Sequence, residues 1–245
     1  MTLAERFSAA ISAEAQDEGD EGHLLPDRLA RVAARLLPVD GAGLSVLAGA
    51  SGWAPLGASS PDAGRAERLQ FTVGAGPCMH AQSTGQPSFV VQDDIRRRWP
   101  AFADLLFTDT PFTGIVALPL RSVVAGAGTM NLFFRDPAGV ARLDVFDALS
   151  VGALVTSALG DAAVWSSWSE AQGPDWLRSP PALRRAAVWQ AVGRIGAARD
   201  VDAPEALALL RAHAYAAGRS VDAVAADLLS GRLDWPDVVG RRAEG

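Results

Sequence analysis

The chain has 245 residues, a formal net charge of −6 and 49% hydrophobic residues, so it is long enough for two domains with buried cores. A single cysteine excludes a disulfide framework, and the acidic balance excludes a general, strongly basic nucleic-acid binder. We expect no apolar run as long as the ~18 residues of a membrane-spanning helix, and no signal peptide. These features predict a cytoplasmic protein that does not enter a membrane.

The sequence of residues 1–160 predicts a short flexible segment followed by an α+β domain. Residues 1–23 are rich in Ala, Glu and Asp, and we expect them to be loosely helical at best. Residues 24–160 combine helical and strand periodicity. Strands are predicted over residues 41–48, 53–58, 87–91, 114–121 and 128–135. Helices are predicted over residues 25–36, just before residue 87, over 99–107, and in a long closing segment with a shared face of Val145, Leu149, Gly152, Ala153, Thr156 and Leu159.

Residues 161–182 are predicted to link this domain to a second one. Pro180 and Pro181 are expected to stop any helix before residue 183. Three tryptophans are expected to anchor the linker by packing, namely Trp165, Trp168 and Trp176. The tail over residues 234–245 is expected to be exposed.

Residues 183–233 predict a bundle of three short amphipathic helices. Asp202 is expected to cap the second helix and Ser220 the third, with Gly218 supplying a positive φ between them. The buried faces are predicted to be Val188, Ala191, Ile195 and Ala198; then Ala206, Leu207, Leu210 and Ala214; then Val221, Val224, Ala225, Leu228 and Leu229. Three helices with one apolar face each can bury those faces against one another or a partner.

The bundle carries a run from Trp189 to Ile195, followed by Glu205, Ala206, Leu207, Leu210, Arg211, Ala214, Val224 and Ala225. With this spacing it resembles the ANTAR domain, a small RNA-binding output module of bacterial transcription antiterminators. The resemblance implies that paired modules bind tandem hairpins in nascent transcripts and prevent a terminator from forming. Many members carry lysine in the first helix where this chain has Val192.

Arginine must supply any phosphate contact, because all 22 basic residues are arginines. Its planar fork binds phosphate oxygens and its flat face stacks on unpaired bases. Residues 183–219 hold six arginines and three acids, a local balance of +3. The candidate RNA-binding residues are Arg194, Arg211, Arg199, Arg219, Arg184 and Arg185, with His213 beside them and Tyr215 as a candidate stacking ring. The alternative is that these arginines are solubilising surface charges and Tyr215 a packing residue.

Residues 24–160 resemble a GAF domain of the kind that is fused to ANTAR modules in actinobacteria. The matching pieces are Leu69 to Cys78, then Asp93, Arg98, Trp99, Pro100 and Phe102, then Ala117 to Arg121. The resemblance implies an antiparallel sheet flanked by helices, a small-molecule pocket on one face of the sheet, and terminal helices that pair two subunits. Cyclic-nucleotide-binding members usually carry a lysine-containing signature, which a chain without Lys cannot have.

The sequence offers no catalytic constellation, cofactor motif or metal site. Cys78 and His80 lie two positions apart without an orienting carboxylate, which does not favour a nucleophilic dyad. The spacing of the three histidines is not that of metal ligands, because His23, His80 and His213 lie far apart in the sequence. Cys78 has two interpretations: a redox-sensing thiolate in a glycine turn, or a small packing residue.

The sequence therefore predicts a homodimeric, signal-responsive antitermination regulator without enzymatic activity. Its GAF-like domain would sense a small ligand or a redox signal, and its ANTAR-like bundle would bind structured RNA. Two alternatives stay open. The bundle could be a degenerate module that binds a protein partner, or the GAF-like scaffold could be a small-molecule enzyme that uses Cys78.

Overall fold

A computed structural model describes residues 1–16, 25–47, 53–122, 126–168 and 180–234. Its centre is one antiparallel five-stranded sheet with the order β2-β1-β5-β4-β3. The strands are β1 (Gly41–Leu47), β2 (Trp53–Ala58), β3 (Ser88–Val91), β4 (Gly114–Ser122) and β5 (Gly126–Phe134). Each predicted strand is present, and the α+β class is confirmed.

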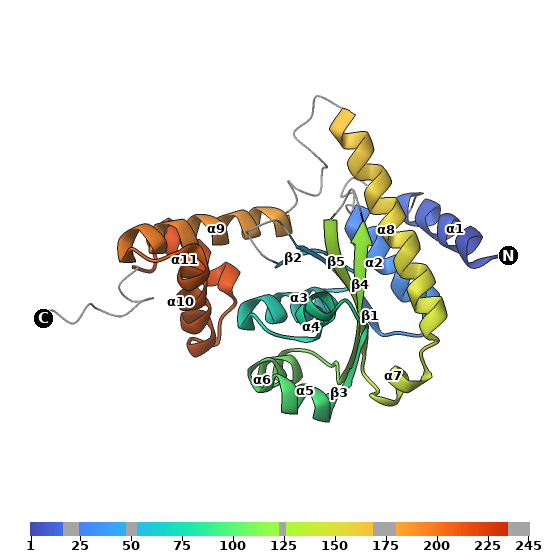
Figure 1. The fold of residues 1–245 in the computed structure, drawn as a ribbon, viewed down its shortest axis with the longest axis horizontal. Coiled ribbons are helices and arrows are strands. Elements are labelled where there is room, and N and C mark those ends of the chain that lie inside the picture. Colours follow the sequence, from blue (N-terminus) through green and yellow to red (C-terminus); the bar gives the residue numbers. More distant parts are fainter. Residues whose placement is uncertain (17–24, 48–52, 123–125, 169–179, 235–245) are drawn as a thin grey trace, which may run out of the picture.

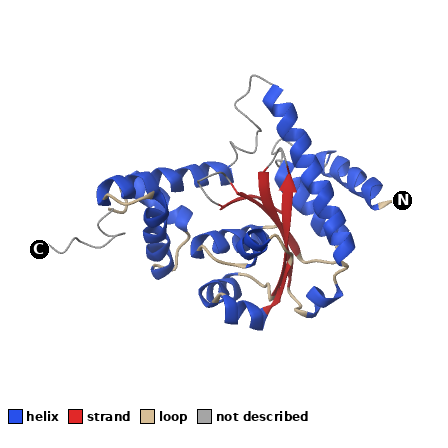
Figure 2. Ribbon diagram, in the orientation of Figure 1, coloured by secondary structure: helices blue, strands red, loops and turns tan. Residues whose placement is uncertain are grey.

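Helices cover both faces of the sheet (Figures 1 and 2). One face carries α1 (Leu3–Gln16), α2 (Leu25–Leu36) and α8 (Val145–Trp168). The other carries α3 (Pro61–Val73), α4 (Pro77–Thr84), α5 (Gln92–Arg98) and α6 (Pro100–Asp109), while α7 (Ala138–Arg142) precedes α8. The bundle of α9 (Pro180–Arg199), α10 (Ala203–Ala216) and α11 (Val221–Ser230) lies beyond α3 and α4. The layers are therefore helices, sheet, helices and bundle.

The strands carry apolar side chains on both faces of the sheet, and both faces are buried. In β5, Met130 and Leu132 belong to the core formed with α1, α2 and α8. Phe133 points the other way, into the core formed with α3 and α6, where it stacks on Phe112 with ring centroids 5.0 Å apart. Side chains alternate between faces along a strand, so a sheet packed on both faces needs apolar residues at both phases.

The flexible segment expected over residues 1–23 is wrong for its first part, because α1 is a packed helix. Phe7 is buried in the core with α2 and α8. The buried Glu14 carboxylate accepts hydrogen bonds from Arg31 Nε and Arg35 Nη2 of α2, both at 2.5 Å. The Ala, Leu and Glu residues of α1 favour a helix, and these tertiary contacts pack it against its neighbours. Residues 17–23 lie outside the described residues.

The apolar face of α8 differs from the predicted one. Gly152 and Leu159 are buried as predicted, with Val151 and Val155 beside them, whereas Val145, Leu149 and Ala153 are exposed. One stretch of α8, Val145–Ala162, has the length and composition of a membrane-spanning helix, which corrects the expectation of no such run. A single helix of this kind is weak grounds for a membrane span, because a helix packed on a core passes the same test.

The bundle forms with the predicted caps and most of the predicted core, except that Ala198 is exposed and Val192 is buried. Asp202 Oδ1 accepts a hydrogen bond from Glu205 N at 2.9 Å, and Ser220 Oγ accepts one from Ala223 N at 3.2 Å. Gly218 has a φ of 61° between α10 and α11. The proline pair at residues 180–181 does not precede the first helix but starts it, because proline is tolerated in the first turn.

The predicted boundaries therefore shift. The closing helix runs to Trp168 and α9 begins at Pro180, so helices occupy both ends of the predicted linker. Residues 169–179, with Trp176, lie outside the described residues, as do residues 235–245 of the predicted tail.

A buried carboxyl, Glu67 of α3, occupies the centre of the second face of the sheet. It accepts hydrogen bonds from Ser45 Oγ and from Asn131 Nδ2, the latter at 2.6 Å. Gly43 makes room for it, since a Cβ at this position would clash with the Glu67 carboxylate. Burial raises the pKa of Glu67 from its ordinary value of 4.5 to about 7, against the lowering effect of the two hydrogen bonds.

This pKa predicts an unusual pH dependence of stability. Between about pH 4.5 and pH 7 the native state holds a proton that the unfolded state releases, so the free energy of unfolding falls as pH rises through this window. The fall is on the order of 3 kcal/mol. Glu67→Gln keeps both hydrogen bonds, because its amide donates to Ser45 and its carbonyl accepts from Asn131. Urea titrations across the window should show a flatter profile for this variant, whereas exposed Glu5→Gln should keep the wild-type profile. A wild-type slope in Glu67→Gln would contradict this assignment.

Candidate functional site

The end of α3 is where the bundle meets the sheet domain, and all three bundle helices contact it there. Phe71 is fully buried and belongs to the hydrophobic core of the bundle as well as to its own helix. The guanidinium carbon of Arg185, from α9, lies 3.3 Å from the centroid of the Phe71 ring, and that of Arg211, from α10, lies 4.8 Å away. We call this group of three side chains the Phe71 clamp.

Arg185 is the most deeply buried cation of the clamp, with 6% of its surface exposed. Its Nη2 lies 3.7 Å from Asp222 Oδ1, and Asp222 of α11 is equally buried. Burial lowers the pKa of Arg185 to about 10, while Asp222 opposes this effect and Arg211 adds to it. Among the described residues, Arg185 Nε and Nη1 have no hydrogen-bond partner. The ion pair is therefore incompletely satisfied.

Arg211 lies against the turn that ends α3. Its Nε donates a hydrogen bond to the carbonyl oxygen of Phe71 at 2.9 Å. The turn is made by Gly74, which has a φ of 74°, and a Cβ there would approach Arg211 Nη1 to 2.8 Å. Glycine is required here both for its positive φ and for the close approach of the arginine. Burial lowers the pKa of Arg211.

The third helix of the bundle is held by a backbone contact. Val221 N, in the first turn of α11, donates a hydrogen bond to Thr72 Oγ1 at 3.3 Å, and Thr72 is fully buried. Helix N-termini have unsatisfied N–H groups, so a hydroxyl from the sheet domain completes this one. Cys78 packs into the same core as Phe71. A buried position in an apolar cluster favours the packing interpretation of this thiol over the redox one.

Two of the cavities along the contact between the sheet domain and the bundle, which we call the seam, are lined by arginines from both sides. One has a volume of about 190 Å³ and contains Arg68 and Glu67 of α3 opposite Arg184 and Arg185 of α9. The other has a volume of about 210 Å³ and contains Arg65 and Arg68 opposite Arg219, between α10 and α11. Like charges therefore face each other across the seam.

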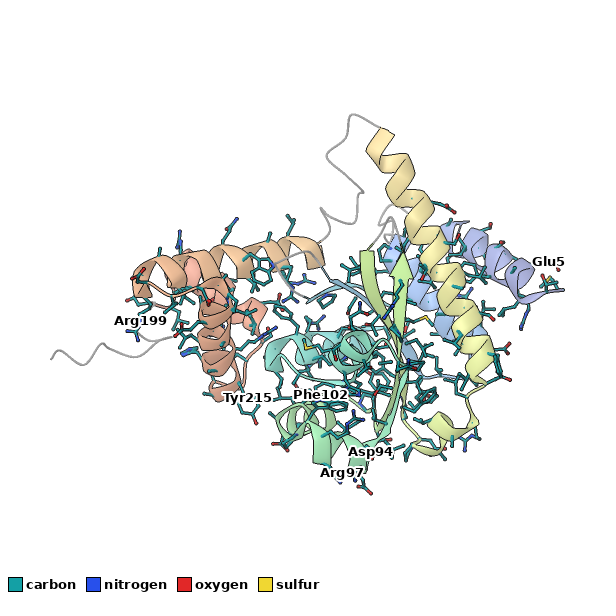
Figure 3. The ribbon with its side chains drawn as sticks, viewed as in Figure 1. Glu5, Asp94, Arg97, Phe102, Arg199 and Tyr215 are labelled. Carbon is teal, nitrogen blue, oxygen red and sulfur yellow. The ribbon has the colours of Figure 1, made fainter. Side chains whose placement is uncertain are left out.

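The structure separates the predicted RNA-binding residues into two groups. Arg185 and Arg211 are in the clamp, and Arg184 and Arg219 line the seam cavities. The others lie elsewhere: Arg194 is exposed, with its Nη1 3.4 Å from Leu229 O, Arg199 is at the end of the bundle far from the sheet, and His213 is half-buried on α10 (Figure 3). They do not share one solvent-facing surface in this arrangement.

Sequence reasoning missed the residues that receive the arginines. Phe71, Thr72 and Gly74 belong to the stretch that resembles a GAF domain, and Asp222 was not singled out at all. The first three side chains carry no charge, so their pattern alone gives no sign of a docking role. Within the described residues, no group of three His, Cys, Asp or Glu side chains is arranged to hold a metal ion.

The clamp makes a prediction about stability. Arg185→Met leaves the buried Asp222 carboxylate without its cation, and we expect it to lower the free energy of unfolding by about 3 kcal/mol. Adding Asp222→Leu removes the orphaned charge and should restore most of this loss. Exposed Arg194→Met serves as the matched control and should change stability by about 0.5 kcal/mol or less. Urea unfolding followed by circular dichroism measures all four proteins, and equal stabilities of Arg185→Met and Arg194→Met would contradict the role of the ion pair.

Comparison with known proteins assigns no family to this fold. No protein-family model matches the sequence, and no curated protein matches it. The GAF and ANTAR resemblances therefore rest on the residues quoted for them, and any function must be argued from the chemistry of the seam and the bundle.

Proposed function

We propose that this protein is a cytoplasmic, signal-responsive regulator whose three-helix bundle binds structured RNA and permits transcription past a terminator. The sheet domain is the sensor and controls how much of the bundle is accessible. The working form is a homodimer, as both resemblances imply, and no catalysis is required. The observation that carries the proposal is the Phe71 clamp, because it occupies the arginines that RNA binding would use.

Docking and RNA binding compete for the same side chains. Arg185 and Arg211 stack on Phe71 in the way that guanidinium groups stack on unpaired bases, and both reach the end of α3 from the bundle. Arg184 and Arg219 face the sheet domain across the seam. Release of the bundle would expose Arg185 and Arg211 beside Arg184, Arg194 and Arg219, which are already exposed in the docked arrangement. The docked arrangement is then the inactive state of a two-state equilibrium.

A second function is favoured by the same contact. The bundle contacts a protein surface by an aromatic ring held between two arginines, and aromatic and arginine residues dominate protein–protein hot spots. A released bundle could therefore bind a partner protein through the surface that contacts Phe71 in the docked state. Arg194 and Arg199, which the clamp does not use, distinguish the two functions, because RNA binding needs cations beyond the clamp and a Phe71-like partner does not.

Removing the ring should activate the protein for RNA. Phe71→Ala deletes the side chain that both arginines contact, so the released state becomes the major one. If at most ~10% of the wild-type protein is in the released state, the apparent affinity for RNA rises at least about tenfold. The RNA is first recovered by crosslinking the protein to transcripts in its native cell, and affinity is then measured by gel shift.

Phe89→Ala is the matched control, since Phe89 lies partly exposed on the edge strand β3. It should leave RNA affinity unchanged. Circular dichroism must show that Phe71→Ala remains helical. A folded Phe71→Ala protein with wild-type or weaker RNA affinity would refute the competition between docking and RNA.

The exposed arginines should contribute to RNA affinity in the released protein. In the Phe71→Ala background, Arg194→Ala should weaken binding and reduce the slope of log affinity against log salt by about 1, because one phosphate contact is lost. Arg6→Ala changes an exposed arginine of α1, outside the bundle. As the control, it should change neither the affinity nor its salt dependence. If Arg194→Ala and Arg199→Ala both leave RNA affinity and its salt dependence unchanged, as Arg6→Ala should, and the released bundle binds partner proteins, then the bundle is a protein-binding module.

A further inference from the structure

We propose that the seam cavity between the sheet domain and the bundle binds a small phosphate-bearing ligand, which holds the bundle in its docked position. The site consists of Arg68 on the sheet domain, Arg184 and Arg185 on the bundle, and Glu67 and Asp222 beside them. Its ligand-binding role does not depend on RNA. Its regulatory effect rests on the proposed function.

The cavity is large enough for more than solvent. Its volume is about 190 Å³, whereas a single water needs roughly 10–15 Å³ on a comparable measure. Its walls come from β2 and α3 on one side and from α9 and α11 on the other. A ligand in this place touches both parts of the protein at once.

The cavity lining has unmet hydrogen-bonding capacity that is mainly on donors, with two unpaired nitrogens on Arg185 and one unpaired acceptor, Asp222 Oδ2. Arg185 is almost fully buried, and two of its guanidinium nitrogens have no hydrogen-bond partner among the described residues. Its contact with Asp222, at 3.7 Å, is too long for a hydrogen bond. A buried cation with open donors is costly unless acceptors reach it. The missing group is therefore an acceptor, and an anionic one matches best.

Like charges across the seam point the same way. Arg68 stands opposite Arg184 and Arg185, and burial together with the charge of Arg184 lowers the pKa of Arg68. Asp27 and Asp222 are the aspartates of the lining, and Asp27 Oδ1 already accepts a hydrogen bond from Ala58 N at 2.9 Å. Three guanidinium groups thus face two aspartates and Glu67, whose raised pKa leaves it only partly charged near pH 7, so the repulsion between the two halves of the seam is under-compensated.

A phosphate group fits these donors better than a carboxylate. It offers three or four oxygens in a tetrahedral arrangement, so guanidinium groups from both domains can bind it together, whereas a carboxylate saturates one fork. Glu67 does not exclude such an anion, because a carboxyl that titrates near 7 can take up a proton as the anion enters. Bound in this way, the anion would replace repulsion across the seam by attraction.

The sign of the regulation follows from linkage. A ligand that contacts both sides of the seam binds the docked state and not the released one, so it stabilises docking. Under the proposed function, it lowers the affinity for RNA. The ligand would therefore signal by its depletion, and the protein would act when the phosphate-bearing compound is scarce.

Calorimetry on the full chain without RNA tests the site. Inorganic phosphate and glucose 6-phosphate serve as probes, with ionic strength matched by chloride. We expect saturable binding that Arg68→Gln and Arg184→Gln each weaken about tenfold or more, and that exposed Arg194→Gln leaves unchanged. Equal affinities for the two probes identify the phosphate group as the whole ligand, whereas tighter binding of glucose 6-phosphate shows that the cavity also binds its body.

Absence of saturable binding for both probes, or equal binding by wild type and Arg68→Gln, would overturn the proposal. Small-angle scattering tests the coupling: in Phe71→Ala, where the released state is the major one, saturating phosphate should lower the radius of gyration toward the docked value of the wild type. A site that binds phosphate in a protein that binds no RNA would leave this inference standing and refute the proposed function. RNA binding without phosphate binding would do the reverse.

Discussion

One aromatic ring determines how the two parts of this protein are arranged. Phe71 lies in the last turn of α3, and its side chain belongs to the core of the bundle. Two guanidinium groups from different helices contact its ring. The Phe71 carbonyl and the Thr72 hydroxyl accept hydrogen bonds from the same bundle. Because α9, α10 and α11 each supply at least one of these contacts, the bundle docks as a unit, and loss of the ring weakens the whole contact.

The seam combines this specific contact with an unfavourable charge distribution. Arginines lie on both sides of it, and the ionic partner of the buried Arg185 in the described part of the chain is Asp222. Buried ion pairs contribute little net stability, but they become costly when one partner is lost. A contact built this way is well suited to a switch, since it is geometrically specific and yet close to balance. Small changes in charge at the seam can then shift the populations of two states.

The sheet domain contributes a second titratable group near this contact. Glu67 lies in the middle of the sheet face and also borders the seam cavity, so its protonation state is linked both to the fold and to the charge of the cavity. α3 thus carries Glu67, Arg68 and Phe71 within five positions, which places the core of the sheet domain, the cavity and the clamp on one helix. This is the physical route by which an event at the cavity reaches the bundle.

The sequence by itself determined the strands, the bundle and its caps, because these depend on local periodicity, on short polar caps and on glycine. It placed β1 to β5 closely and identified Asp202, Gly218 and Ser220 correctly. Tertiary structure alone decided that α1 is ordered through Glu14 and its arginine partners, that α8 buries Val151 and not Leu149, and that Arg185 and Arg211 face the sheet domain. Periodicity shows that a helix has an apolar side. The surface that an arginine contacts depends on residues far away in the chain, so a local sequence pattern does not predict it.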